Sequence, residues 1–373
     1  MQALISLLQD LVKIPSVCGS EEQIGSFVRT WFRKNELPAQ IVSVKPNRFN
    51  VVTLLRGSRP GPRIMLNGHM DTVEVGRGWT HDPFGGTVEG GRMYGRGTTD
   101  MKAGLACILW AAVKCKEEGL PRKGELTVAA VVDEEAVDLG TYALVQQGFT
   151  KGLDFAIVAE STDLQVVNAH RGRTVIEVTV HGRAAHSHWP DHGVNAIEKA
   201  SILINAITQL RGPLHPRMGY STVNTLKIEG GQDEVMLVPD QCHFVIDRCL
   251  VPGFDSEDAL GEVKQLIGKL GVDAEARFVT RETPFCEPFE LSEDDRYVQL
   301  VSETAMKVLG TKPSIGYHEG PCDSCILVNQ GKIPTVEFGP SGGRLHESDE
   351  YVEVDSVRKT AEVYLEILRR LLS

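Results

Sequence analysis

The sequence predicts an α/β fold in which a discontinuous three-layer α/β/α domain carries an inserted α+β domain. Helix and strand patterns alternate in the first and last parts of the chain, as is typical of a mostly parallel sheet covered by helices. Between these parts the order changes to β-α-β-β-α-β, the pattern of a small ferredoxin-like domain. The length of 373 residues also favours two domains over one. We therefore expect an outer domain of residues 1–171 and 282–373, and an inserted lid of residues 172–281.

Apolar spacing predicts the elements of the outer domain. Leu4, Leu7, Leu8 and Leu11 recur at helical spacing, whereas runs such as "ELTVAAVV" are short and apolar, as in a buried strand. The predicted helices cover 2–13, 20–36, 102–118, 139–148, 293–309, 322–331 and 356–372. The predicted strands cover 49–55, 63–69, 125–132, 154–160, 313–318 and 333–339.

Apolar spacing also predicts the elements of the lid. The predicted strands cover 174–182, 220–231, 242–251 and 274–280, and the predicted helices cover 193–211 and 256–270. Cys322 and Cys325 form a C-x-x-C pair, but a structural zinc site needs four ligands. We interpret this pair as two small residues that open a helix.

Composition and charge exclude several classes of partner. The chain is 42% hydrophobic and 24% charged, and no apolar run approaches the roughly 18 residues of a membrane span. A net charge of −11 disfavours nucleic acid and anionic membrane surfaces. The N-terminal apolar residues follow no basic leader, and the eight cysteines are scattered. These features favour the cytoplasm.

Polar side chains follow four of the predicted strands of the outer domain. One strand delivers His69 and Asp71, and the next delivers the adjacent pair Glu134 and Glu135. Of the two other strands, "DFAIVAE" ends at Glu160, and "TVEFGPSGGRLHE" leads to His346. Because ligands bind at the carboxyl ends of strands in an open α/β sheet, these side chains are expected to meet in one crevice.

Asp100 closes the glycine-rich turn "YGRGTTD" and opens a helix, where it is either a helix cap or a further ligand. Histidine with carboxylates suits zinc or a similar first-row ion. Two divalent cations bring +4 and Asp100, Glu135 and Glu160 bring −3, so one hydroxide, the nucleophile of a hydrolase, completes neutrality. Asp71 is placed to orient the imidazole of His69. The other glutamate of the adjacent pair becomes a general base, but spacing does not say which glutamate has which role.

The motifs "GHMDT", "GRGTTDMKAG", "DEE", "AEST" and "GRLH" resemble those of one family over nearly the whole chain. This is the family of co-catalytic zinc amidohydrolases that includes acetylornithine deacetylase, succinyl-diaminopimelate desuccinylase, aminoacylase and carboxypeptidase G. The resemblance implies Glu134 as the base and Asp71 as the orienting acid. It implies two Zn²⁺ per subunit, with Co²⁺ or Mn²⁺ as substitutes, held by five ligands: His69 and Glu160 on one ion, Glu135 and His346 on the other, and Asp100 as the bridge.

The resemblance also indicates the reaction. Glutamate at position 160 goes with the deacylase branch, so we expect hydrolysis of the amide bond of an N-acyl L-amino acid by a metal-bound water that Glu134 activates. The alternative is a dipeptidase or a carboxypeptidase G-like metallopeptidase. A third hypothesis is a catalytically silent relative used for binding. The five ligands and the base are all present, which favours the enzyme.

The lid supplies three further candidates and a prediction about assembly. His186 in "GRAAHSHWP" matches a family segment, which implies that it contacts the developing oxyanion. The alternative is a surface histidine. Asn224 and Arg248 match positions that approach the substrate, although an edge-strand salt bridge would equally explain Arg248. The resemblance further implies a homodimer through the lid, in which His186 reaches the neighbour's active site.

Overall fold

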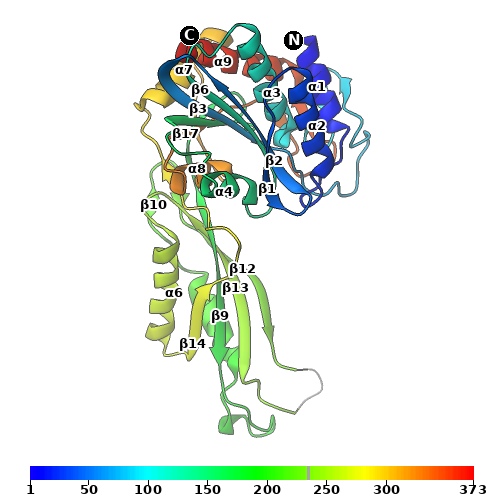
Figure 1. Cartoon of the computed structure of the whole chain (residues 1–373). Coiled ribbons are helices and arrows are strands. Elements are labelled where there is room, and N and C mark those ends of the chain that lie inside the picture. Colours follow the sequence, from blue (N-terminus) through cyan, green and yellow to red (C-terminus); the bar gives the residue numbers. More distant parts are fainter. Residues whose placement is uncertain (233–235) are drawn as a thin grey trace. The chain divides into compact units, whose positions relative to one another are not determined.

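The computed structural model describes residues 1–232 and 236–373 and divides the chain into two compact units, which are drawn in Figure 1. The first unit comprises Met1–Ala169, Leu291–Gly316 and Cys322–Ser373. The second comprises His170–Glu290 and Tyr317–Pro321.

The first unit is built on a twisted sheet with the strand order β1-β2-β6-β3-β7-β17-β8. Its strands are β1 (Gln40–Lys45), β2 (Arg48–Arg56), β3 (Arg59–His69), β6 (Lys123–Val131), β7 (Phe155–Val158), β8 (Val166–His170) and β17 (Thr335–Glu337). The central pairs β6–β3, β3–β7 and β7–β17 are parallel. The flanking pairs β1–β2, β2–β6 and β17–β8 are antiparallel, so the sheet is more mixed than the sequence predicted. The β1–β2 pair is antiparallel because a short turn joins the two strands and no helix intervenes.

Two apolar clusters cover the two faces of this sheet and make the unit three-layered. Successive strand residues point to opposite faces, so Leu66 and Val128 enter one cluster while Met65 and Ala129 enter the other. The first cluster packs against α1 (Gln2–Val12), α2 (Glu22–Lys34), α3 (Ala103–Glu117), α7 (Arg296–Leu309) and α9 (Val354–Leu372). The second packs against α4 (Leu139–Gln146) and α8 (Asp323–Asn329).

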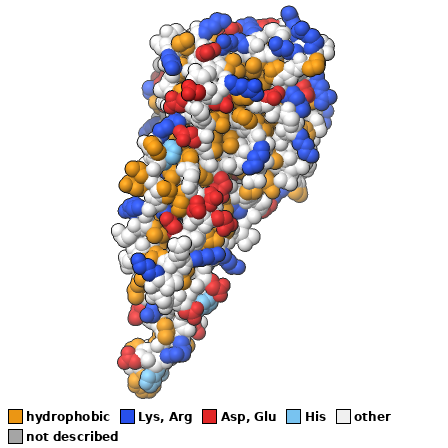
Figure 2. Space-filling model, turned by 90° about the vertical axis from the view of Figure 1, so that its left-hand side faces the viewer, with side chains coloured by type: hydrophobic (Ala, Val, Ile, Leu, Met, Phe, Trp, Pro, Cys, Tyr) orange, Lys and Arg blue, Asp and Glu red, His pale blue; other side chains and the backbone are white. Residues whose placement is uncertain are grey.

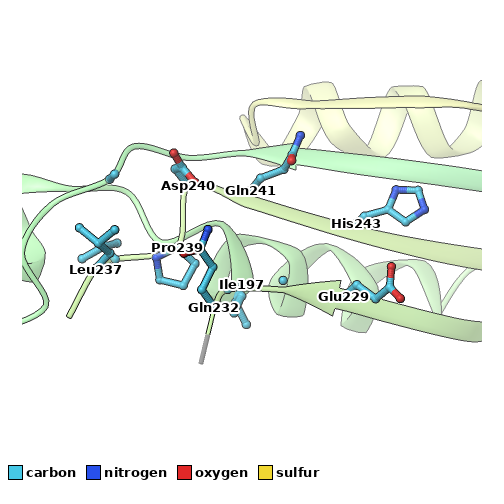
Figure 3. Close-up of a pocket in the computed structure, with 12 residues that line it drawn as sticks. Ile197, Glu229, Gln232, Leu237, Pro239, Asp240, Gln241 and His243 are labelled. Carbon is cyan, nitrogen blue, oxygen red and sulfur yellow. The ribbon is translucent and has the colours of Figure 1, made fainter. Parts of the chain in front are cut away.

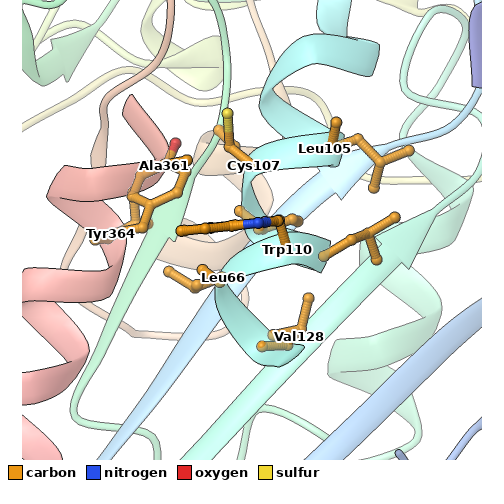
Figure 4. Close-up of a cluster of buried hydrophobic side chains, with 14 of the residues drawn as sticks. Leu66, Leu105, Cys107, Trp110, Val128, Ala361 and Tyr364 are labelled. Carbon is orange, nitrogen blue, oxygen red and sulfur yellow. The ribbon is translucent and has the colours of Figure 1, made fainter. Parts of the chain in front are cut away.

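Helix α3 is the centre of the larger cluster. Twelve of its fifteen residues are buried, so it is apolar on all sides and not only along one stripe. Figure 4 shows Trp110 of this helix between Leu66 of β3 and Tyr364 of α9. Because α3 begins three residues after Asp100, the packing of this helix fixes the position of the turn that carries Asp100.

The second unit has the predicted β-α-β-β-α-β order. Its strands β9 (Gly172–His181), β12 (Val223–Gly230), β13 (Gln241–Leu250) and β14 (Ala274–Phe278) form an antiparallel sheet in the order β12-β13-β9-β14. Helices α5 (Ala196–Ile207) and α6 (Ser256–Leu270) cover one face of the sheet, which buries alternate residues of β9 and β13. Asp255 closes a capping box at the start of α6, and Gly271 ends that helix in the left-handed conformation.

The boundaries of this unit differ from the predicted 172–281. The chain after β14 stays with the second unit to Glu290 because Arg173 N–H donates to the Cys286 carbonyl at 2.8 Å. Residues Tyr317–Pro321 also belong to it, since the Arg171 N–H donates to the carbonyl of His318 at 3.1 Å. Contacts between distant segments decide both boundaries, and no local pattern marks them.

Several short elements were not predicted. A small sheet in the order β18-β19-β5-β4 joins residues far apart in sequence, and β10 and β11 form a separate hairpin. The short elements are β4 (Thr87–Glu89), β5 (Arg92–Tyr94), η1 (Thr98–Lys102), η2 (Pro190–His192), β10 (Leu214–His215), β11 (Gly219–Tyr220), β15 (Phe289–Glu290), β18 (Gly342–Gly343) and β19 (Tyr351–Glu353). The strand predicted at 313–318 is present as β16 (Ile315–His318). As interpreted from the sequence, Cys322 caps a helix: it lies at the N-cap of α8.

The surface and the helices bear on the predicted partners. Among the helices that the structure describes, none is long and apolar enough to span a membrane. On the face drawn in Figure 2, acidic and basic side chains are interspersed. The net charge of −11 is therefore not gathered into one field on that face.

Candidate active site

The candidate site lies in the first unit, at the carboxyl ends of its parallel strands. His69 is the last residue of β3, and Glu134 and Glu135 follow the end of β6 at Val131. Glu160 comes two residues after the end of β7, and His346 comes after β17. The ladder pairs His69 with Val131, so these strands end side by side. The sheet topology therefore brings side chains together that the sequence holds almost 280 residues apart.

Asp100 lies between the two histidines. The Nε2 of His69 is 3.1 Å from Oδ1 of Asp100, and the Nε2 of His346 is 3.1 Å from Oδ2 of the same carboxylate. Each imidazole therefore faces a different oxygen of one carboxylate. This is the arrangement that a ligand shared between two cations requires.

Two further carboxylates complete the cluster. Oε1 of Glu160 is 3.5 Å from the Nε2 of His69, and Oε2 of Glu135 is 3.1 Å from the Nε2 of His346. One ligand atom each of His69, Asp100 and Glu135 lies within 4.8 Å of the others. The side chains thus form two groups that meet at Asp100.

Asp100 is not the cap of the following helix. Helix α3 begins at Ala103 with Lys102 at the N-cap position, and no side chain caps it. The backbone of Asp100 is itself non-helical, with φ −120° and ψ 94°. This conformation turns the carboxylate toward the histidines, so the helix-cap alternative does not apply, and the role of Asp100 as a ligand stays a prediction.

Asp71 connects the histidine strand to the pair of glutamates. Its carboxylate accepts the backbone N–H of Glu134 at 3.3 Å and that of Glu135 at 3.0 Å. The Nδ1 of His69 lies 3.0 Å from the backbone oxygen of Asp71 and 3.7 Å from its carboxylate. The main chain of Asp71 therefore orients the imidazole, while its carboxylate fixes the turn of the glutamates.

The same turn is held from its other side by a contact that the sequence analysis missed. The guanidinium of Arg48 pairs with Glu21 and with Asp133, the residue before Glu134, at 2.5 Å from the Asp133 carboxylate. Glu21 and Asp133 are both buried. An acidic residue directly before the two glutamates was the one available signal, because a third carboxylate there needs a cation.

Burial and crowding shift the pKa values of the site. Burial lowers the pKa of His69, but the hydrogen bond to Asp100 and the neighbouring carboxylates raise it well above its ordinary value. Hydrogen bonds to Asp100 and Glu135 raise the pKa of His346 to about 10. Burial raises the pKa of Glu134 well above its ordinary value, and the charge of Glu160 adds to this effect.

These residues fit divalent cations. For the protein alone, the raised histidine pKa values mean that imidazolium protons balance the crowded carboxylates, and a cation would displace those protons. Oε1 of Glu135 is buried and has no hydrogen-bond partner among the residues that the structure describes, so it keeps a lone pair for a ligand. Two imidazoles with three carboxylates form a donor set suited to zinc and similar ions.

The second unit carries the other candidates. His186 is half-buried in a loop, where its Nδ1 accepts the backbone N–H of His188 at 3.2 Å. Asn224 on β12 is exposed and lines a cavity of about 210 Å³ together with Arg173 and Asp247. Arg173 and Asp247 form an ion pair with each other, in which the Nε of Arg173 is 2.9 Å from the Oδ1 of Asp247.

Arg248 lies on the opposite face of the sheet from Asn224. It is only 1% exposed, shares the helix-covered face with Ile246 and Leu250, and its Nη2 is 2.6 Å from Glu262 of α6. Its charge is therefore already paired. This contact favours the salt bridge over the substrate contact as the explanation for Arg248.

One cavity of the second unit has a volume of about 790 Å³, and none of the proposed ligands lines it. Figure 3 shows Glu229 and His243 at one end of it and Leu237 and Asp240 at the other. Leu237 also forms a β-bridge with His186, so this cavity adjoins the loop that carries His186.

A three-layer α/β/α unit with this cluster at its strand ends, interrupted by a ferredoxin-like unit, defines a class of metal-dependent amide hydrolases. The chain belongs to Peptidase family M20/M25/M40, which residues 65–370 match. It is thus a metallopeptidase or amidohydrolase of that family, as the sequence motifs predicted, and the family depends on metal.

Relatives and solved structures cover the whole chain. A probable succinyl-diaminopimelate desuccinylase of Staphylococcus epidermidis is 26% identical over 403 residues, which cover 100% of this chain and 98% of the relative. Acetylornithine deacetylase of Klebsiella pneumoniae is 28% identical, with 98% and 96% covered. A tripeptidase from Staphylococcus aureus has a TM-score of 0.80 at 24% identity, with 99% and 98% covered. A dinuclear metal-binding M20 peptidase from Bacillus subtilis has a TM-score of 0.75 at 17% identity, with 100% and 98% covered. These two structures confirm the predicted fold.

Proposed function

We propose that the protein hydrolyses the amide bond of an N-acyl L-amino acid and releases a carboxylic acid and a free amine. One observation carries this proposal: the two oxygens of Asp100 each lie 3.1 Å from a different histidine, with Glu135 and Glu160 beside them. This donor set fits two divalent cations, for which Zn²⁺ is our proposal and Co²⁺ or Mn²⁺ the substitutes.

The chain's own residues have separate roles in this reaction. His69, Glu160, Asp100, Glu135 and His346 would hold the cations. Bound there, the cations would supply Lewis acidity to the substrate carbonyl and to water. Glu134 takes a proton from the attacking water and delivers it to the nitrogen as the C–N bond breaks.

The choice of N-acyl substrates has two supports. The curated relatives are named as a desuccinylase and a deacetylase, and glutamate occupies position 160. The alternative is a dipeptidase or a carboxypeptidase G-like peptidase. The titles of the solved structures name peptidases, but at 24% identity and below they speak for the fold alone.

The test is a substrate panel with metal analysis. We would measure kcat/KM for N-acetyl, N-succinyl and N-carbamoyl amino acids, with dipeptides and tripeptides as controls, on protein of known metal content. Highest kcat/KM on an N-acyl amino acid supports the proposal. Highest kcat/KM on a peptide supports the alternative, and no turnover by metal-loaded protein on any member supports the silent relative.

We further propose that His186 stabilises the developing oxyanion. Because the Nδ1 of His186 accepts an N–H, the neutral ring carries its proton on Nε2. An imidazole Nε2–H is a hydrogen-bond donor, so it can donate to a carbonyl oxygen. The neighbouring Trp189 ring, 4.9 Å away, limits rotation of the imidazole.

The proposed partner is a second copy of the chain, paired through the second unit. Strand β12 is an edge strand of its sheet, and within the described residues only β13 pairs with it. Its apolar side chains Leu226 and Ile228 are each 51% exposed, and Leu237 beyond the strand is equally exposed. An exposed edge strand with apolar side chains favours pairing with another chain.

A mixture of two inactive variants tests whether the sites are shared. His186→Ala keeps the base and Glu134→Gln keeps the histidine, so a mixed dimer with shared sites has one complete site. Random subunit exchange makes half of the dimers mixed, and activity should return to about a quarter of wild type. Unrestored activity, or a monomer in sedimentation at all concentrations, contradicts the shared site.

A further inference from the structure

Glu350 is a buried carboxylate that touches the turn of Asp100 without lying in the ligand cluster. It is 0% exposed. Its Oε1 accepts the backbone N–H of Thr99 at 2.9 Å and that of Asp100 at 3.1 Å. Its Oε2 accepts the N–H of Gly97 at 2.9 Å and Nη1 of Arg96 at 2.7 Å. Four donors therefore occupy both oxygens, which leaves this carboxylate unsuited to be a metal ligand.

The turn needs these hydrogen bonds because it makes few of its own. Gly97 has φ 77°, and Asp100 and Met101 are non-helical, so these N–H groups find no regular helical acceptors. A buried backbone N–H without a partner is destabilising, and Glu350 supplies acceptors for three such groups. The buried guanidinium of Arg96 balances its charge.

The small sheet formed by β18, β19, β5 and β4 fixes Glu350 in place. Its backbone oxygen accepts the N–H of Gly95 at 3.0 Å, and the next residue, Tyr351, pairs with Tyr94. His346 lies four residues earlier on the same segment. Glu350 thus joins the segment that carries one histidine to the turn that carries the carboxylate between both histidines.

We propose that Glu350 is a positioning residue that sets the affinity of the site for metal by fixing the Asp100 carboxylate relative to His346. It acts through the backbone of the turn and touches neither substrate nor cation. The inference rests on the proposed ligand set, in which Asp100 is the shared ligand.

The test is metal affinity in the absence of substrate. Glu350→Gln keeps the shape of the side chain, but its amide nitrogen faces donors where an oxygen accepted them. Competition of Zn²⁺ with a chromophoric chelator should show affinity lowered about 10–100-fold, as for other residues that orient ligands. In the Co²⁺-loaded protein the visible absorption bands should shift, because they report the ligand geometry.

The adjacent Asp349 gives a matched control. Its carboxylate accepts the N–H of Thr80 at 2.8 Å, the hydroxyl of Thr80 at 2.9 Å and the N–H of His81 at 3.1 Å, on a segment with no proposed ligand. Asp349→Asn should leave metal affinity within about threefold of wild type, even if both variants lose similar thermal stability.

Each outcome decides the question. Wild-type affinity in Glu350→Gln, or an equal loss in Asp349→Asn, overturns the positioning role. Should Glu350→Gln not fold, Glu350→Asp keeps the charge with a shorter reach, and it should show a partial loss of affinity; wild-type affinity there also overturns the role. If the wild-type protein binds no metal, the proposed ligand set fails and the inference falls with it.

Discussion

Replacing Glu134 or Glu135 by glutamine separates the roles of two adjacent residues. Both variants keep the side-chain volume, and both keep the backbone N–H that Asp71 accepts. Oε2 of Glu135 lies 3.1 Å from the Nε2 of His346, within the ligand cluster. Oε2 of Glu134 lies 3.8 Å from the Nε2 of His69, at the margin of that cluster. We therefore expect different defects from the same chemical change.

The size of the Glu134→Gln defect follows from the loss of a proton carrier. A general base contributes about 10²–10⁴ in rate, so kcat should fall by that factor, which corresponds to about 2.7–5.4 kcal/mol of barrier. Metal content should stay at the wild-type value because no ligand is removed. Glu135→Gln should instead lower the metal content, since a neutral amide oxygen replaces a charged ligand.

The assay measures kcat, metal per subunit and unfolding temperature for both variants on one substrate. A wild-type unfolding temperature in metal-loaded Glu134→Gln serves as the control for an intact fold. If Glu134→Gln lost metal while Glu135→Gln kept it and lost only kcat, the two assignments would be exchanged. Wild-type kcat in Glu134→Gln would refute its role as the base.

Three further outcomes are expected. Chelation should abolish activity and lower the unfolding temperature, with both restored by Zn²⁺; full activity of protein shown to be metal-free would contradict the mechanism. Arg48→Met should cost about 3–5 kcal/mol in denaturant unfolding because it leaves Glu21 and Asp133 buried without their cation, whereas the exposed pair broken by Arg56→Met should cost under about 1 kcal/mol. Burial raises the pKa of Asp323 to about 8, so in metal-free protein between pH 4 and 8 this carboxyl holds its proton in the folded state and loses it in the unfolded chain, and its contribution to stability falls as pH rises. Asp323→Asn should flatten this slope and be more stable than wild type at pH 8 by a few kcal/mol, and an unchanged slope would show that Asp323 is not the group responsible.

The sequence predicted the cluster because strand ends are easy to locate. A buried strand is a short apolar run, and His69, Glu134 and Glu160 come directly after such runs. The sheet then brings the strand ends to one edge, so a one-dimensional pattern was enough to group the residues. The family resemblance was needed to assign roles within the adjacent glutamate pair.

Other features depend on contacts that no local pattern records. Glu350 follows a loop, and the N–H groups that it accepts belong to a turn about 250 residues earlier. Backbone donors leave no trace in residue type. For Arg248 a signal existed: it alternates with Phe244, Ile246 and Leu250, which predicts a side chain on the buried face of its strand.

The insertion of one unit into the other has a consequence for synthesis on the ribosome. Four of the proposed ligands, His69 to Glu160, emerge before the second unit, whereas His346, Glu350 and helix α9 emerge after it. At about 5–20 residues per second, Glu160 precedes His346 by on the order of 10–40 s. During that interval the nascent first unit lacks α9, which packs against α3, and its apolar surface is open to chaperones. The second unit ends at Pro321, so all of it has been synthesised before His346 emerges. We therefore expect the second unit to fold before the first.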